Sequence, residues 1–401
     1  MRICFAVFYL VLFFLLMPPE TRAWQIENIH IHGFVSQGFM ISDRNNYLAE
    51  SSEGSFEFNE AAINFSRYFD PNFHMGCQIF SRDIGDVGNN KIELDWALAN
   101  YRLRDSLGFR LGRIKVPHGL YNETRDVDML RTFIFLPPVY YDISRSTINA
   151  IDGIGVYGNL LFDSIGSIDY QIINGVKNID PESGWSRYME RRGLNITEFD
   201  TDYAACAAIA WHPGIEGLRL GTSGIFLDIN ANADITTFSL LQNCRIDNGP
   251  DIHYKLDNLK IQVGYLEYTL RKLILAFEYM TFRGDLKLIP FASPMVISIP
   301  IQTDTFYLSL VYRLSDILEM GGYYSVFWPD VSDRQGTMQR WNYLGWHKEA
   351  AICFRVDITD ALVFKAETHL INGGALMMPQ DNLDGVDQRT ALFLLKLTYS
   401  F

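Results

Sequence analysis

Charged residues gather in one part of the sequence, between positions 113 and 145, and point to the handling of charged solutes. Acidic and basic side chains alternate there over short distances, and charges fixed at a narrow point of a passage set which ions pass. Arg113 and Lys115 are two positions apart, so they share a face if they lie on a strand. The candidate lining residues are Arg113, Lys115, Glu123, Arg125, Asp126, Asp128, Arg131 and Arg145, with Arg82 and Arg355 from elsewhere in the chain.

The segment that carries most of these charges, residues 117–151, also contains the apolar stretch FIFLPPVYY. Because burial of so apolar a stretch is favourable, we expect it to pack against an inner wall and to hold the neighbouring charges at a constriction. With Asp142 the segment has four acids and three arginines, so the sign of the preferred ion stays open. A loop folded over an outer rim, or used in a contact between subunits, is the alternative.

The elements that would carry such a passage are strands with one apolar and one polar face. Residues 389–401 have an apolar face that ends in Tyr399 and Phe401, whereas the other face carries Lys396 and three hydroxyl groups. The runs AAICFRVD and LVFKAETHL also collect their charges on one face. A lysine or arginine turned to lipid at mid-bilayer costs about 2–4 kcal/mol. This alternation therefore predicts strands between lipid and water.

The amino terminus predicts export. Residues 1–23 contain Arg2, fifteen apolar residues and small residues up to Ala23, as in a secretory signal peptide. Fifteen apolar residues are fewer than the about 20 that a transmembrane helix needs. No later segment has 18 consecutive apolar residues. Because every amide in lipid must be paired internally, an exported chain with these strands predicts an antiparallel β-barrel over residues 24–401 in a bacterial outer membrane.

Turn residues divide the chain into about sixteen strands, with fourteen or eighteen as alternatives. Seven short connections, near 68–72, 103–107, 163–164, 212–217, 270–272, 314–316 and 357–361, are expected on the periplasmic side. Eight longer segments are expected outside, close to 41–55, 83–90, 117–151, 176–201, 230–258, 283–304, 328–347 and 372–388. The last strand must pair with the first to close the ring. A barrel of this size leaves an aqueous channel.

Residues 110–142, RLGRIKVPHGLYNETRDVDMLRTFIFLPPVYYD, resemble the strand and third loop of the phosphate-selective porin O and P family. The matching positions are Gly112, Arg113, Lys115, Pro117, Gly119 and 121–126. That resemblance implies a trimeric sixteen-stranded channel for small hydrophilic solutes, with anions preferred in some members. The ending LTYSF is similar to the signature of outer-membrane barrels, which implies that Phe401 is read by the barrel assembly machinery.

Other functions find less support in the sequence. A formal charge of −13 argues against nucleic acid as a partner, and no cofactor or metal motif is present. A barrel-embedded hydrolase needs an activated serine, and no GxSxG motif occurs. A non-conducting structural or adhesive barrel remains the other alternative. The mature chain would keep Cys77, Cys206, Cys244 and Cys353, which we expect to fill strands rather than to form disulfides.

Overall fold

The computed structural model describes residues 24–401 except 27, 86, 141–144, 192, 237–244 and 247–248. The expected signal peptide, Asp142 and Cys244 therefore lie outside the described residues. Cys77, Cys206 and Cys353 are free thiols, as expected. Within the described chain no helix has the length and hydropathy needed to cross a membrane.

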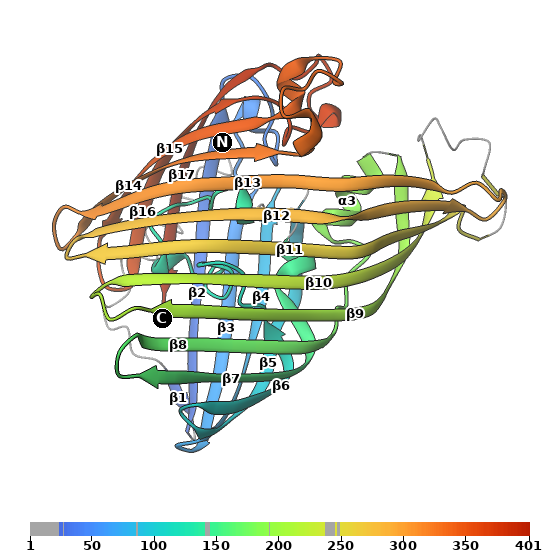
Figure 1. The fold of residues 1–401 in the computed structure, drawn as a ribbon. Coiled ribbons are helices and arrows are strands. Elements are labelled where there is room, and N and C mark those ends of the chain that lie inside the picture. Colours follow the sequence, from blue (N-terminus) through green and yellow to red (C-terminus); the bar gives the residue numbers. More distant parts are fainter. Residues whose placement is uncertain are drawn as a thin grey trace.

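Sixteen antiparallel strands form a closed barrel (Figure 1). Each strand pairs with the next in sequence, and β17 pairs with β2. The strands are β2 (Ile29–Ser42), β3 (Phe58–Asp70), β4 (Phe73–Ile84), β5 (Val87–Arg104), β6 (Leu107–Lys115), β7 (Ala150–Phe162), β8 (Gly166–Val176), β9 (Leu194–His212), β10 (Leu218–Ile235), β11 (Ile252–Leu270), β12 (Leu273–Pro290), β13 (Ile297–Arg313), β14 (Leu318–Trp328), β15 (His347–Asp357), β16 (Leu362–Asn372) and β17 (Arg389–Ser400).

The chain terminus closes the ring, as the sequence predicts. The pairing of β17 with β2 runs from Leu392 opposite Ser42 to Ser400 opposite Phe34. Phe401 then exchanges two backbone hydrogen bonds of 3.0 Å with Gly33. Beyond that point the short strand β1 (Trp24–Ile26) pairs with the first residues of β2. The closure leaves β17 no open edge on which another chain could add a strand.

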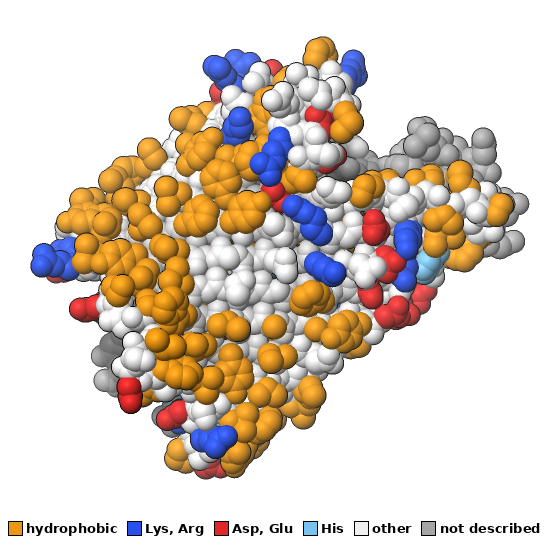
Figure 2. Space-filling view, viewed as in Figure 1, with side chains coloured by type: hydrophobic (Ala, Val, Ile, Leu, Met, Phe, Trp, Pro, Cys, Tyr) orange, Lys and Arg blue, Asp and Glu red, His pale blue; other side chains and the backbone are white. Residues whose placement is uncertain are grey.

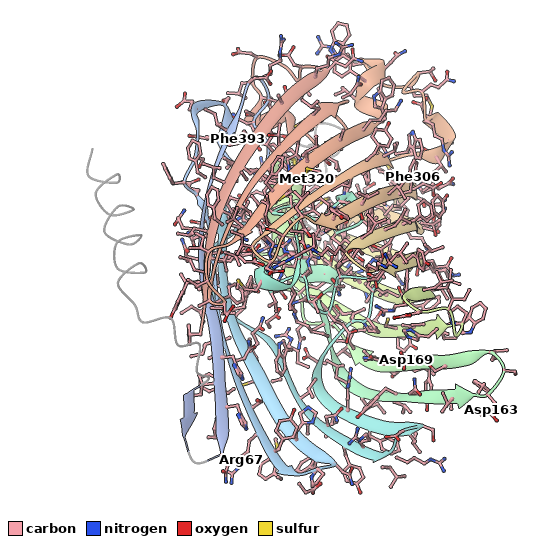
Figure 3. All side chains as sticks on the ribbon, turned by 90° about the vertical axis from the view of Figure 1, so that its left-hand side faces the viewer. Arg67, Asp163, Asp169, Phe306, Met320 and Phe393 are labelled. Atoms are coloured by element: carbon pink, nitrogen blue, oxygen red, sulfur yellow. The ribbon has the colours of Figure 1, made fainter. Side chains whose placement is uncertain are left out.

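Side chains alternate between the two faces of the wall as predicted. On β15, Ile352 and Phe354 are 55% and 45% exposed on the outer face, whereas Cys353 is fully buried on the inner face. On β17, Phe393 faces outward and Lys396 is buried inside. Figure 3 shows Phe306, Met320 and Phe393 on the outer surface, and Asp163 beside one of the short turns. The outer face is therefore apolar over a broad area.

All seven short turns occur where the sequence predicts them, but two of the longer segments are wrong. The 83–90 segment is mostly strand, because β4 ends at Ile84 and β5 begins at Val87. The 283–304 segment lies largely within β12 and β13, which are joined by residues 291–296. Gly85 and Gly88 have positive φ angles of 58° and 95° there, so they allow a turn much tighter than the surrounding polar residues suggest.

Among the described residues, helices are few and short. They are α2 (Arg145–Ile148) and α3 (Gly184–Arg191), with 3₁₀ turns η1 (Ser51–Glu53), η2 (Asp128–Leu130), η3 (Pro138–Tyr140), η6 (Val331–Asp333), η7 (Asn342–Gly345) and η8 (Pro379–Asp381). All of them lie in the connections on the side of the barrel opposite the short turns. The side chains of Met189 in α3 and Ile148 in α2 join a buried apolar cluster with the inner faces of β9–β12.

Strands β9–β13 have 17 to 19 residues each and extend beyond the rest of the wall (Figure 1). Such a strand is about 60 Å long, so at a tilt of about 40° it is much taller than an apolar band of about 25 Å. On β10 the outer face changes from Leu218, Leu220 and Phe226 to Asp228, Asn230, Asn232 and Asp234. The inner face changes the opposite way, from Ser223 to Ile225, Leu227 and Ile229. The upper wall therefore has the polarity of a water-soluble sheet.

Candidate constriction site

The described part of the loop between β6 and β7, residues 116–149, contacts the inner faces of strands on several sides. Its backbone amides at Gly119 and Leu120 donate to Ser223 on β10 and Glu278 on β12, at 3.0 and 2.7 Å. The hydroxyl of Thr132 donates to Glu319 on β14. The apolar stretch lies against the wall, where the ring centroids of Phe135 and Phe58 are 5.3 Å apart. The loop is thus an internal element rather than a rim.

Glu278 is one of two carboxylates that anchor this loop. It is fully buried on β12 and accepts hydrogen bonds from Leu120 N, from the hydroxyl of Tyr140 in η3 and from the hydroxyl of Tyr307 on β13. The distances are 2.7 Å from Leu120 and from Tyr307 to the carboxylate. A buried carboxylate needs such donors because it has lost its hydration shell. The start and the middle of the loop are therefore tied to one side chain.

Glu367 on β16 is the second anchor. Its two oxygens accept from Ile134 N and Phe135 N, at 2.7 and 2.9 Å. His369 lies between Glu367 and Glu349, with Nε2 2.7 Å from Glu367 and Nδ1 in contact with Glu349. Each ring nitrogen faces a carboxylate, and a carboxylate can only accept. His369 therefore bridges the two carboxylates, and Glu367 accepts from His369 as well as from the two loop amides.

Asp128 in η2 binds two lysines from the wall. Its Oδ2 lies 3.1 Å from the ammonium of Lys365 on β16, and its Oδ1 lies 3.2 Å from that of Lys396 on β17. Thr398 donates to Oδ2 at 2.8 Å. Burial alone would raise the pKa of Asp128, but the two ammonium groups hold it well below its usual value. Asp128 is thus a fixed negative charge that cancels part of the lysine charge.

Asp126 and Arg145 join the two limbs of the loop to β5. The Arg145 guanidinium lies 2.7 Å from Asp126 and 2.6 Å from Asp95, and it stacks over Phe80 at 4.2 Å. The ammonium of Lys115 lies 2.6 Å from Asp126 and 3.1 Å from Asp95. Despite burial, the Arg145 and Lys115 charges hold the pKa of Asp126 well below its usual value. The four groups form a compensated network of two cations and two anions.

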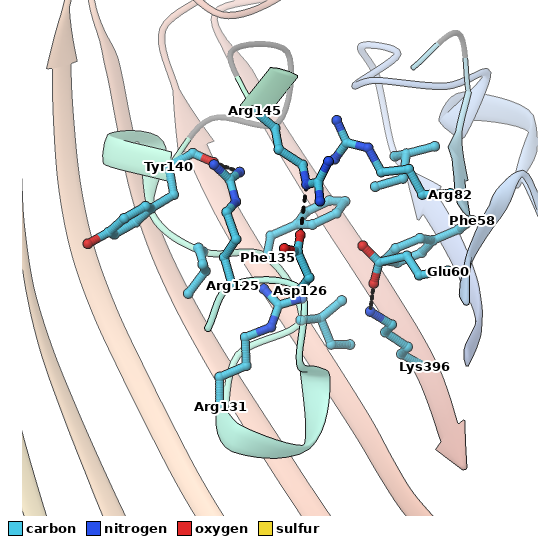
Figure 4. Close-up of a pocket in the computed structure, with 13 residues that line it drawn as sticks. Phe58, Glu60, Arg82, Arg125, Asp126, Arg131, Phe135, Tyr140, Arg145 and Lys396 are labelled. Atoms are coloured by element: carbon cyan, nitrogen blue, oxygen red, sulfur yellow. Dashed lines mark hydrogen bonds and ion pairs between the residues drawn. The ribbon is translucent and has the colours of Figure 1, made fainter. Parts of the chain in front are cut away.

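A narrow cavity lies between the loop and the wall formed by β3, β4 and β17 (Figure 4). Its volume of about 10 Å³ is room for about one water molecule. Phe58, Phe135 and Tyr140 supply apolar walls. The charged side chains that line it are Glu60, Arg82, Arg125, Asp126, Arg131, Arg145 and Lys396. Five basic and two acidic side chains therefore meet at this constriction.

Most of the sequence-predicted lining residues are brought together here. Arg82, Arg125, Asp126, Arg131 and Arg145 line the cavity. Asp128 lies 3.5 Å from Arg131. Lys115 and Arg355 contact residues that line the cavity: Lys115 forms an ion pair with Asp126, and Arg355 donates to the carbonyl of Arg131 at 3.1 Å. Gathering residues so far apart in sequence requires the inward fold of the loop.

Arg113 and Glu123 do not line the cavity. Arg113 shares its parity on β6 with Leu111, which is 62% exposed on the outer face. It pairs with Asp152, whose carboxylate lies 3.3 Å from its Nε, and it donates to Leu94 O. The placement of Arg113 beside Lys115 on the lumen face is therefore corrected: Lys115 reaches Asp95 and Asp126, whereas Arg113 bridges β5 and β7. Glu123 lies 3.8 Å from Arg110.

Several residues of the site escaped the sequence reasoning. Lys396, Lys365 and Glu367 were assigned to the inner faces of their strands, but nothing in the sequence shows that the loop reaches them. Glu278 is a single acid in apolar surroundings and Asp95 lies two residues after Glu93, so neither stands out in the sequence as a partner of the loop. Their roles depend on contacts between positions as much as 270 residues apart, as between Asp128 and Thr398.

Comparison with known proteins supports the fold. No family model matches the sequence, and no curated protein matches it either. Among solved structures, the outer membrane channel DcaP of Acinetobacter baumannii has a TM-score of 0.53 at 10% identity, over 94% of this chain and 99% of that one. The anion-selective porin from Comamonas acidovorans has 0.51 at 9%, over 93% and 99%. The trimer form of OmpT, an outer membrane protein of Vibrio cholerae, has 0.52 at 10%, over 93% and 99%. The chain therefore has the fold of an outer-membrane porin barrel.

Proposed function

We propose that the chain is an outer-membrane porin that lets small hydrophilic solutes and ions diffuse passively through its barrel. The observation that carries this proposal is the inward loop, which brings charged residues to a constriction inside a closed ring of sixteen strands. Passive diffusion needs no catalytic group, and His369, the histidine beside a carboxylate, hydrogen-bonds to the loop anchor Glu367. The signal peptide over residues 1–23 would deliver the chain to the membrane.

The finer part of the proposal is a preference for anions. Five basic and two acidic side chains line the cavity beside the loop, so basic side chains outnumber acidic ones there, and fixed charges beside a passage bias which ions pass. One solved structure with this fold is an anion-selective porin. The resemblance of residues 110–142 to phosphate-selective porins agrees with the same sign. Inorganic phosphate and small carboxylates are the solutes to test first.

The proposed partners follow from the same fold. The broad apolar outer face suits outer-membrane lipid (Figure 2). A homotrimer is proposed because a trimer form is known for one structure with this fold. Phe401, at the end of the closing strand, is the proposed signal for the barrel assembly machinery.

Conductance of the purified protein in a planar bilayer tests the function. We expect stable steps, grouped in threes for a trimer, and a reversal potential in a salt gradient that indicates anion preference. A heat-unfolded sample of the same preparation is the control, because it keeps the composition but loses the barrel. Conductance no greater than that of the control would contradict the proposal.

The same conductance measurement tests the second candidate function, a non-conducting structural or adhesive barrel. Two observations favour this function: the small volume of the cavity and the hydrogen bonds that hold the loop to the wall. A folded protein without conductance would establish this alternative, whereas stepwise conductance would exclude it. A cation-selective reversal potential would keep the channel and remove the anion preference.

A further inference from the structure

The outer face of the long strands changes from apolar to polar along a definite line. On β12 the outward residues Phe277 and Tyr279 are followed by Arg283, Asp285 and Lys287. On β11 the change lies between Leu266 and Lys260. Lipid hydrocarbon must end where outward side chains become charged, because a charged group within it is costly. This line therefore lies at the level of the lipid head groups.

Three basic side chains meet at this line. Lys260 pairs across the sheet with Arg283, so both project from the outer face side by side. Arg334, in the connection between β14 and β15, reaches the same place and lies over the ring of Trp328 at 4.6 Å. Arg283 and Arg334 are 37% and 48% exposed. Figure 2 shows basic side chains along the border where the apolar area gives way to the polar wall.

Among the described residues, Asp304 is the one carboxylate that forms ion pairs with these three cations. Asp304 contacts Arg283 and lies 2.7 Å from Arg334, so one carboxylate serves two guanidinium groups. Among the described residues, Lys260 has no ion pair within 4 Å. Asp257 lies further from the apolar area. Its carboxylate forms ion pairs with the ammonium groups of Lys287, at 2.6 Å, and Lys255, at 3.6 Å. Asp285 also lies beyond the line, two residues past Arg283.

We propose that Lys260, Arg283 and Arg334 bind the phosphate groups of outer-leaflet lipid. Three observations support a lipid phosphate: the cations border the apolar area, they outnumber the carboxylate that contacts them, and they are exposed or partly exposed on the outside of the wall. Arginine and lysine are the usual donors to phosphate. Tyr279, whose hydroxyl donates to Asp304 at 2.7 Å, and Trp328 add aromatic rings of the kind found at membrane interfaces. The proposal rests on the outer-membrane placement given above.

Lipid binding by the full folded chain in detergent tests this. The probes are bisphosphorylated lipid A and the same lipid with its phosphates removed, counted by native mass spectrometry. The variant K260Q/R283Q/R334Q is expected to bind bisphosphorylated lipid A at least ten-fold more weakly, because each cation near a charged lipid surface is worth about 1 kcal/mol. The matched control K255Q/K287Q removes two cations of the same strands above the line and is expected to bind as the unchanged protein does.

Each outcome separates this proposal from its rivals. Equal binding by the triple variant, or equal binding of the dephosphorylated lipid, would overturn it. Displacement of lipid A by millimolar inorganic phosphate would show a general anion site instead. Should the triple variant not fold, R334Q alone, which lies outside the sheet, is expected to weaken binding about five-fold. If the variants keep the conductance of the unchanged protein, the test of the lipid site does not depend on the test of the proposed channel.

Discussion

His118 shows how a single residue in the inward loop can govern stability. It is fully buried, its ring lies edge-on to Tyr140, and neither ring nitrogen has a hydrogen-bond partner among the described residues. Burial, with a smaller contribution from the Arg125 charge, lowers the pKa of His118 to about 3. The histidine therefore stays neutral in the folded barrel at pH values where the unfolded chain binds a proton.

This predicts a loss of stability in mild acid. Because the folded pKa is lower than the unfolded value of about 6.5, protonation of the unfolded chain destabilises the barrel from pH 6.5 down to about 3, by on the order of 5 kcal/mol. The variant His118→Phe should lose this dependence. Urea unfolding at pH 7 and pH 5 measures it, with His212→Phe at an exposed position as control. An equal pH slope in His118→Phe and in the unchanged protein would refute the assignment.

Arg82 and Arg113 give a matched pair for the permeation path. Arg82 lines the constriction, whereas Arg113 bridges β5 and β7 within the wall. Replacing Arg82 with Ala should move the reversal potential toward cations, because one of five basic side chains is lost there. Replacing Arg113 with Ala should leave the potential unchanged. A shift caused by Arg113→Ala alone would mean that the path runs elsewhere.

The inward loop depends, as an element, on a few wall carboxylates. Of these, Glu367 accepts two loop amides and one hydrogen bond from His369. A Gln side chain has one acceptor oxygen in place of two, so its introduction would leave at least one of the loop amides unpaired, and a buried polar group left unpaired costs about 1–3 kcal/mol. We therefore expect a loss of that size in unfolding free energy.

The same variant should change the loop before it changes the barrel. Glu367→Gln is expected to give noisier conductance and faster proteolytic cleavage in residues 116–149, with the heat-modifiable barrel band retained. Glu182→Gln, at a position whose side chain is 64% exposed, is the control. Quiet conductance together with unchanged proteolysis in Glu367→Gln would show that the loop is held by other contacts.

For the whole molecule, the sequence predicted the barrel well because alternation repeats in every strand. The seven short turns, the sixteen strands and the closing pair of β17 with β2 follow from local pattern and from the need to pair every amide in lipid. The extra height of β9–β13 was missed because apolar and polar faces exchange sides along each strand. Polar outward residues such as Asn230 and Asn232 were therefore assigned to loops.

The site was predicted less completely than the fold. Charges within residues 117–151 were recognised because they are close in sequence, and the apolar stretch correctly indicated an inner wall. Their partners Lys365, Glu367 and Lys396 lie on distant strands, and pairing across the lumen leaves no local signal. The side of Arg113 was misjudged because it was placed with Lys115 by shared parity, whereas Lys115, at the end of β6, reaches Asp95 and Asp126 and Arg113 does not.

Side chains of the barrel wall bind the inward loop through hydrogen bonds and ion pairs. The backbone hydrogen bonds that close the barrel join one strand to the next and do not involve the loop. The backbone pairing of the barrel therefore does not depend on which charges the loop carries. An engineered or naturally diverged loop could carry a different set of charges, and thus pass different solutes, provided that it still offers amides to Glu278 and Glu367 and a carboxylate to Lys365 and Lys396.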